Sequence, residues 1–414
     1  MSHNQTSNFN TTQHNLWQAP WGYVESFFIV FGAILIGFLW QISLGNLSIK
    51  LLAFPNNIIV AITYILCLFL LQKKFTNILI VKWFTSIPAT ITLLSAVLFM
   101  VLLMGTIPQS ISENIIINTL GLNQITSHWA FYIVQLLLLT ALGMVTLKRS
   151  FPFYKHNLGF ILNHAGLFIT LLAGLLGASD VQKWKMIVTE DKSQQIVINE
   201  NNELKELDFK IHLYDFQMDE YLPKLTVVDN VTGKVVLKEQ NIMIDTVETT
   251  QFSFQDYKIV VTQFLSSAGK IEDKYVAVYD LGTPPAAQLK ITNLNNNEVQ
   301  HHWVTCGSFL YPYEAVKLSK QYSILMTFPE PKKFTSTVDF ISHDTLKNVH
   351  IEVNKPVDFK GWKIYQLSYE EEMGKWSQTS TFELVRDPWL PIIYAGIFMM
   401  LSGAVFLFWK GPKK

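Results

Sequence analysis

The chain has 414 residues, of which 50% are hydrophobic and 15% charged, and its mean hydropathy is +0.24. This composition is typical of a membrane protein, and nothing in it is basic enough for nucleic-acid binding. The formal net charge is zero but unevenly distributed. Of the 32 acidic residues, 30 lie between Asp180 and Asp387, where Lys and Arg number 22, which leaves this segment at −8. A mildly acidic, polar segment therefore separates two apolar regions.

The first 23 residues are polar and contain neither Lys nor Arg. They resemble neither the basic start of a cleaved signal peptide nor an Arg-rich transit peptide. The first apolar stretch is therefore expected to be a retained helix that follows an N-terminal tail, 1–23.

Six apolar stretches are long enough to cross the roughly 30 Å hydrocarbon layer of a bilayer as helices. They are 24–44, 51–72, 84–105, 129–147, 158–178 and 389–409. Pro55, Asn56 and Asn57 interrupt the start of the second stretch, which is the weakest of the six. The chain is thus predicted to be a polytopic α-helical membrane protein with about six transmembrane helices.

Basic residues in the short connections predict the orientation, because Lys and Arg are enriched in cytoplasmic loops. Three basic clusters would share one side of the membrane: Lys73, Lys74 and Lys82; Lys148, Arg149 and Lys155; Lys410, Lys413 and Lys414. The connections on the other side contain only Lys50. Both termini are then cytoplasmic, with a five-helix region at 24–178, an extracytoplasmic domain at 179–388, and a final helix with a basic cytoplasmic tail at 389–414.

The extracytoplasmic domain is predicted to be β-rich. Short runs such as LKITNL, YKIVVTQF, NVHIEV and WKIYQLSY combine β-branched and aromatic residues, and Gly-, Asn- and Pro-containing turns separate them. No helical period is sustained there, so we expect a sandwich or a barrel-like assembly. The uncharged loop 106–127, which would also lie outside, could contain a short interfacial helix.

One histidine, His164, lies within a predicted span, in GFILNHAGLFITLLAGLLG at 159–177. Small or polar residues recur there every three or four positions and form one stripe, which predicts close packing against another helix. The stripe consists of Gly159, Asn163, Gly166, Thr170, Gly174 and Gly177. An ionisable residue inside a span is a functional candidate by default.

Three roles are open to His164. It could form an interhelical hydrogen bond together with Asn163, take part in a proton relay, or bind a metal or haem iron through a neutral imidazole nitrogen. A relay is disfavoured because the spans supply no convincing further ionisable group. A bis-histidine haem site would need a second histidine, and none of the other nine lies in a span. If His164 binds haem, its mate comes from another polypeptide or the site is five-coordinate.

Other candidate sites are weaker. His301 and His302 are adjacent in a predicted strand, so their side chains point to opposite faces and do not form a ready chelate. Cys67 and Cys306 are too few for a disulfide scaffold, and the lack of a C-x-x-C motif argues against a thiol–disulfide carrier. Cys306 is expected to be a small buried residue. Phosphate-binding loops, nucleophile elbows and paired-carboxylate motifs are missing, and no catalytic residue is predicted.

An ordered set of motifs resembles the ResB (CcsB) family. The set includes WQAPWGYVES at the N-terminus, GTIPQ at 105–109, LNHAGLFITLLAGLLGASD at 162–180, PKKFTSTVDF at 331–340 and VRDPWLPIIYAG at 385–396. The resemblance follows the chain in order over nearly its whole length. Two features differ from the family pattern: six spans rather than the four often described, and HWAF where a SWPF-like motif is expected.

The resemblance implies a role in cytochrome c biogenesis, as the CcsB half of a system II cytochrome c synthase in a bacterial cytoplasmic (inner) membrane. Its implied partner is a CcsA (ResC)-type membrane protein, which carries the tryptophan-rich WWD motif and the external histidine ligands. The pair would transfer haem b across the membrane and attach it to the CXXCH thiols of apocytochrome c in the periplasm. Thiol-reducing proteins are further possible partners; nucleic acid is not one.

Within that family resemblance, His164 is the candidate axial ligand to a haem iron shared with the partner. This chain would then be a non-catalytic or co-catalytic subunit of the haem-attaching complex. The alternative hypothesis is a membrane-anchored extracytoplasmic binding or sensory protein without haem chemistry, in which the helices serve only as a scaffold. A stand-alone b-type redox enzyme is disfavoured, because the second histidine is missing.

Overall fold

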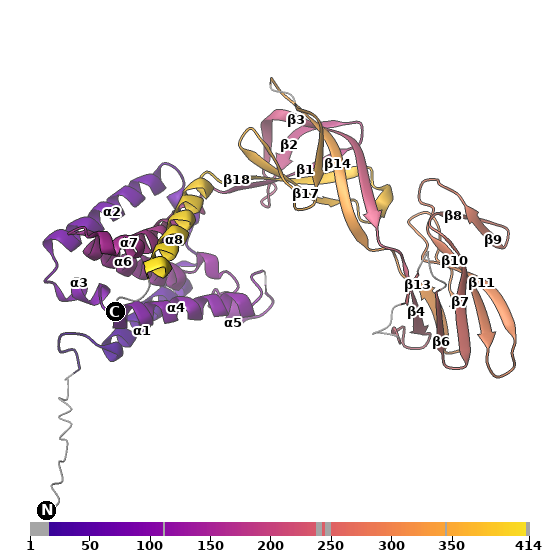
Figure 1. The fold of residues 1–414 in the computed structure, drawn as a ribbon, viewed down its shortest axis with the longest axis horizontal. Coiled ribbons are helices and arrows are strands. Elements are labelled where there is room, and N and C mark those ends of the chain that lie inside the picture. The colour runs from indigo at the N-terminus through magenta and orange to yellow at the C-terminus, as the bar shows by residue number, and fades with distance from the viewer. Residues whose placement is uncertain (1–15, 111, 237–241, 245–249, 344–345, 411–414) are drawn as a thin grey trace, which may run out of the picture. The chain divides into compact units, whose positions relative to one another are not determined.

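The computed structural model describes residues 16–110, 112–236, 242–244, 250–343 and 346–410 (Figure 1). The chain divides into two compact units, one formed by Met1–Val181 with Asp387–Lys414 and the other by Gln182–Arg386. Most of the expected N-terminal tail, with His3 and His14, lies outside the described residues, as do Lys413 and Lys414 of the basic C-terminal tail.

The first unit is helical and contains six helices long and apolar enough to cross a membrane. They are α1 (Tyr23–Leu44), α2 (Asn56–Lys74), α4 (Ile87–Thr106), α6 (Trp129–Ser150), α7 (Leu158–Gly177) and α8 (Leu390–Lys410). Two short helices, α3 (Leu79–Phe84) and α5 (Ile115–Thr119), lie in the connections. Many large apolar side chains on the long helices face outward, as expected where lipid replaces water. The predicted number of long apolar helices is confirmed.

The starts of two helices differ from the predicted spans. The second helix begins at Asn56 rather than at 51, after a 3₁₀ turn at Ile49–Leu52. The reason is Pro55, whose ring disfavours helical backbone at the preceding residue and removes a donor. α4 begins at Ile87 rather than at 84, because the Ser86 hydroxyl caps it by accepting a hydrogen bond from the Ala89 N–H at 3.3 Å.

The core of the helical unit lies where α1, α4 and α6 pack together. Trp83, which is almost fully buried, donates its indole N–H to the hydroxyl of Ser26 at 2.9 Å. The neighbouring Glu25 accepts a hydrogen bond from the Gly22 N–H at 2.9 Å and so closes the start of α1. The PWGYVES motif near the N-terminus therefore has a structural role at the end of this three-helix core.

The connection 106–127 contains the expected short helix, α5, and also a 3₁₀ turn at Ile125–Ser127. Gln109, the last residue of GTIPQ, organises this connection with its side-chain amide. It donates to the carbonyl of Leu122 at 3.1 Å and accepts from the Ile125 N–H at 2.9 Å. Because these bonds satisfy backbone groups, the motif holds the loop in one conformation.

The second unit is built from β-strands, as predicted. Its larger part is an antiparallel eight-stranded sheet. In sheet order the strands are β15 (Leu346–Glu352), β14 (Pro331–Ile341), β3 (Leu204–Glu220), β2 (Ser193–Ile198), β1 (Gln182–Thr189), β18 (Thr379–Arg386), β17 (Trp362–Tyr369) and β16 (Val357–Phe359). Ile351 at one edge and Phe359 at the other share a single core with Phe209 from the middle of the sheet. The sheet therefore curls around its own core.

The remaining strands form a two-sheet sandwich. One sheet has the order β11 (Val299–Thr305), β10 (Ala286–Asn293), β7 (Tyr257–Leu265) and β6 (Gln251–Phe254). The other has the order β12 (Val316–Lys317), β13 (Tyr322–Met326), β4 (Lys224–Asp229) and β5 (Ile242–Met243). Val227 and Leu289, one from each sheet, are fully buried in the shared core. A separate hairpin of β8 (Ala268–Ile271) and β9 (Lys274–Ala277) accompanies the sandwich.

The strands that begin and end the second unit lie side by side. β1 and β18 pair antiparallel along their full length, from Gln182 opposite Arg386 to Thr189 opposite Thr379. The chain therefore enters and leaves this unit on neighbouring strands.

Candidate functional site

His164 lies in α7 and is half-buried. Its Nδ1 is 3.1 Å from the carbonyl oxygen of Phe160, one turn earlier. A carbonyl oxygen can only accept, so Nδ1 carries the proton in this hydrogen bond. Nε2 then keeps its lone pair, and within the described part of the chain it has no hydrogen-bond partner. This tautomer is the one that an imidazole needs in order to bind a metal through Nε2.

The orientation of the ring is further constrained by stacking. The Phe160 ring lies 3.7 Å from the His164 ring, centre to centre, at an angle of 21°. The Arg149 guanidinium lies 4.1 Å from the centre of the Phe160 ring, which adds a cation–π contact. One backbone hydrogen bond and one aromatic neighbour, itself in contact with a cation, therefore hold the imidazole.

A cavity of about 540 Å³ lies beside His164. Its wall is formed by the start of α4, the end of α6 and the start of α7, and it combines apolar side chains with two cations. The lining residues include Ile87, Ile91, Val145, Lys148, Arg149, Phe160 and His164. A volume of this size is within the range of small-molecule and cofactor sites. The arrangement offers one nitrogen ligand, an apolar wall and positive charge for an anionic group.

The small-residue stripe of α7 packs against α8. A Cβ on Gly159 would contact Phe406 and Leu407, and one on Gly177 would collide with the Trp389 ring. At Gly166 the added atom would lie 2.5 Å from the carbonyl oxygen of Gly396 and from the backbone N of Met400. The two helices therefore approach closely and run antiparallel.

Of the other stripe residues, Asn163 and Thr170 also contact α8, whereas Gly174 does not. Asn163 donates from Nδ2 to the carbonyl of Met400 in α8 at 3.2 Å, and Thr170 lies where a Cβ on Gly396 would collide with it. Gly174 is exposed, with nothing within 4 Å of an added Cβ. The interhelical hydrogen bond is thus formed by Asn163, whereas the hydrogen bond of His164 to the Phe160 carbonyl stays within α7.

No other histidine of the described chain is among the residues that line this cavity. His128 is fully buried and caps α6: its Nδ1 accepts from the Ala130 N–H at 3.0 Å, and its Nε2 lies 3.0 Å from the Leu120 carbonyl. Both nitrogens are therefore used. His156 is exposed and stacks on Tyr154. His301 and His302 are exposed on β11, and no cluster of metal-ligating side chains occurs among the described residues.

Asp180, which sequence analysis did not single out, joins three helix ends. Its carboxylate accepts hydrogen bonds from the Phe54 N–H at 2.8 Å, from Nδ2 of Asn57 at 2.7 Å and from the Trp389 indole N–H at 2.8 Å. Partial burial raises the pKa of Asp180, but the three donors outweigh it and hold this pKa below its usual value. The only sequence signal was a carboxylate directly after an apolar run.

Asp180→Asn is expected to lower the free energy of unfolding of the helical unit by about 2 kcal/mol. The amide oxygen accepts hydrogen bonds more weakly than a carboxylate does, and the amide NH₂ would face N–H groups that also donate. The folded pKa is lower than the unfolded value of about 3.9, so the contribution of the carboxylate is present above that pH and is lost as pH falls through the folded pKa. Thermal unfolding of wild type and variant in detergent, at neutral and at acidic pH, measures how this contribution depends on pH. An equal melting-temperature difference between variant and wild type at both pH values would contradict it.

Comparison with known protein families gives a match within the β-rich unit. The model of the ResB-like family matches residues 304–378, a segment of the β-rich unit from the end of β11 to the residue before β18. A search of curated proteins finds no match to the chain. The family resemblance carried by the ordered motifs is thus confirmed over this segment, which is similar to a family whose general role is cytochrome c biogenesis.

Proposed function

We propose that this chain is a subunit of a system II cytochrome c synthase, which works with a CcsA/ResC-type membrane protein to transfer haem b and attach it to apocytochrome c. The observation that carries the proposal is the state of His164. Its Nδ1–H donates to a backbone carbonyl, and Nε2, beside a cavity, has no hydrogen-bond partner among the described residues. In a chain with a ResB-like segment, haem is the ligand that this nitrogen fits best.

The residues around the cavity fit a haem group in three respects. Nε2 of His164 would be one axial ligand. Ile87, Ile91 and Val145 would contact the apolar part of the macrocycle. Lys148 and Arg149 supply cations for its carboxylates, since charge-assisted hydrogen bonds to carboxylate are among the strongest in proteins. When bound, haem would supply the iron centre and the vinyl groups that react with thiols; the chain's own part is to bind and orient it.

The second axial ligand is proposed to come from the partner. The sequence has no second histidine within a predicted span, and His128, at the start of α6, uses both ring nitrogens in hydrogen bonds. A site completed in trans explains why one imidazole lies alone among apolar helices. It also makes haem binding dependent on assembly, so this chain would be a co-catalytic subunit.

The proposed location is the bacterial cytoplasmic membrane, with both termini inside and the β-rich unit in the periplasm. Supporting this, the basic ends of two helices meet: Lys73 of α2 and Lys148 of α6 line one common pocket. Arg149 lies at the same end of α6. Basic helix ends favour the cytoplasmic side. His164 would then lie about one and a half turns from the cytoplasmic boundary.

The test is to purify the full-length chain alone and after co-expression with a CcsA-type partner, and to record absorption spectra and haem content. A Soret band in the co-purified complex, with cytochrome c maturation that requires both proteins, is the expected result. A membrane-anchored binding protein without haem chemistry would instead purify without haem in both cases and would leave maturation unchanged when deleted. That outcome would refute the proposal.

A further inference from the structure

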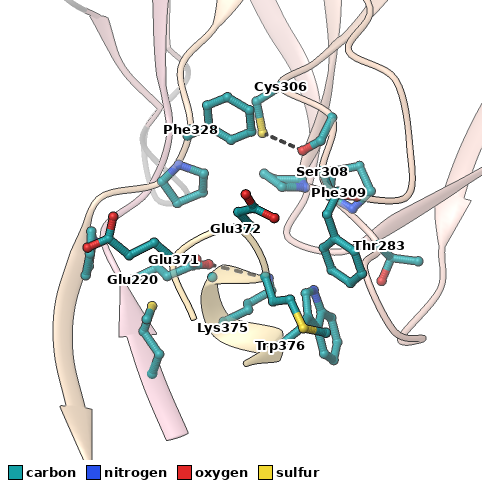
Figure 2. Close-up of a pocket in the computed structure, with 18 of the residues that line it drawn as sticks. Glu220, Thr283, Cys306, Ser308, Phe309, Phe328, Glu371, Glu372, Lys375 and Trp376 are labelled. Carbon is teal, nitrogen blue, oxygen red and sulfur yellow. Dashed lines mark hydrogen bonds and ion pairs between the residues drawn. The ribbon is translucent and has the colours of Figure 1, made fainter. Parts of the chain in front are cut away.

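The β-rich unit contains a second cavity, of about 620 Å³, which the proposed haem chemistry does not use. Several segments distant in sequence border it: the end of β3, the residues before β10, those after β11, those between β13 and β14, and those after β17 (Figure 2). Three of these five segments lie in 304–378, the part that matches the ResB-like family. The family-matched segment therefore supplies most of one concave surface.

The mouth of this cavity exposes large aromatic side chains. Phe328 is 68% exposed and Phe309 is 39% exposed, and both line the cavity. Tyr369 and Trp376 add two half-buried rings to the wall. Exposed aromatic residues around a concavity are typical of interaction sites, where such side chains provide most of the binding energy.

The charge of the wall is negative. Glu220, Glu371 and Glu372 line it, and among the described lining residues Lys375 is the one Lys or Arg. Lys375 lies 3.5 Å from a Glu220 oxygen and 5.5 Å from the centre of the Trp376 ring (Figure 2). The two other carboxylates, Glu371 and Glu372, are exposed. The lining groups thus carry a net charge of −2 at neutral pH.

Two weak acids in the wall have raised pKa values, mainly because they are buried. Burial raises the pKa of the Cys306 thiol to about 12, and the charge of Glu220 adds to the increase. Burial also raises the pKa of the Tyr369 hydroxyl, with further contributions from Glu371 and Glu220. A buried thiol with so high a pKa is a poor nucleophile, and Cys306 contributes to the wall by packing.

The wall is also poor in groups that would bind an anion. Pro284, Pro285, Pro329 and Pro331 line it and have no N–H to donate. The lining ammonium of Lys375 is already paired with Glu220. The wall therefore favours cations next to apolar groups. Lys375 is an example of this kind of cation binding, because its ammonium lies near both the Glu220 carboxylate and the face of the Trp376 ring.

We infer that this cavity, named here the acidic aromatic pocket and defined by Glu220, Phe309, Phe328, Glu371, Glu372 and Trp376, binds an extended polypeptide segment in which Lys or Arg alternates with apolar residues. The apolar side chains contact the rings, and the cations pair with Glu371 and Glu372. The inference rests on the proposed function for the source of the segment: it gives the substrate polypeptide a docking site on the outer unit.

The test uses the haem-free, full-length chain in nanodiscs of neutral lipid and a fluorescein-labelled Lys/Leu/Gly peptide that carries a benzophenone photocrosslinker. We expect saturable binding by fluorescence anisotropy, weakened by salt, with crosslinks that map to 306–309 and 371–376. The double variant Glu371→Lys/Glu372→Lys should raise Kd at least about tenfold. Phe309→Ala/Phe328→Ala should raise it as well; these side chains are exposed, so folding is preserved.

The matched control is Glu200→Lys/Asp273→Lys, which makes the same change in net charge at two exposed positions outside the pocket. Its Kd should stay within about twofold of wild type. Equal weakening by the control, equal binding of a Glu/Leu/Gly peptide, or crosslinks confined to other segments would each overturn the inference. Because no haem is present, peptide binding and the role of His164 can fail separately.

Discussion

Replacing His164 by Ala is expected to lower the haem content of the complex with the CcsA-type partner at least about tenfold, and cytochrome c maturation with it. The substitution removes Nε2, which has no partner in the part of the chain that the structure describes, and no other histidine lines the cavity there. The fold should survive, because the hydrogen bond that the described structure gives to His164 is to the Phe160 carbonyl of the same helix. Pyridine haemochrome measurement on the purified complex gives the haem content.

Two further variants separate ligation from packing. His164→Gly leaves a space that free imidazole can enter, so added imidazole should restore part of the haem content in this variant and none in wild type. His156→Ala removes an exposed histidine at the start of the same segment and should load haem normally. Normal loading in both His164 variants without imidazole would remove the axial-ligand role from the proposal.

Gly166→Ala is expected to destabilise the helical unit by about 2 kcal/mol, since the new methyl would lie 2.5 Å from backbone atoms of α8. Backbone atoms cannot move aside as a flexible side chain does, so α7 and α8 must separate along their length. Thermal unfolding of the full-length chain in detergent, followed by size-exclusion recovery after heating, measures the loss.

Gly174→Ala is the matched control for this substitution. The residue lies on the same stripe of the same helix, but an added Cβ meets nothing within 4 Å. Because Ala favours helix over Gly by up to about 1 kcal/mol, this variant should be as stable as wild type or slightly more so. If both variants lost the same stability, glycine conformational freedom rather than the α7–α8 contact would be the cause.

The sequence was sufficient to predict those parts of the fold that depend mainly on one physical rule. A bilayer requires about 20 apolar residues for each helix, and all six stretches of that length became helices. The errors were local: Pro55 and Ser86 moved two helix starts by a few residues. Alternating β-branched residues predicted a β-rich unit. They did not predict its division into a curled sheet and a sandwich, because strand order depends on long-range pairing that no short run encodes.

For the candidate site, the sequence supplied His164 and the stripe but not their surroundings. His164 was found because an ionisable residue inside an apolar run is conspicuous. The stacking of Phe160 on His164 could not be predicted, because Phe160 is one of many apolar residues in the same helix. Arg149 was used only to predict membrane orientation, and its contact with Phe160 was not predicted. The bonds of Asp180 join residues 123 to 209 positions away, so nothing near it in sequence indicated its partners. Spacing along one helix was readable, whereas contacts between helices were not.

The pairing of Gln182 with Arg386 has a consequence for how such a chain could arise. Where both ends of a folded segment are adjacent, that segment can be spliced into a tight turn between two packed helices without altering either of them. A helical hairpin made of α7 and α8, held by its glycine contacts, would then be the older scaffold. On this account the roughly two hundred residues between the two helices form an inserted domain, whose sequence can change while the packing of α7 against α8 is kept.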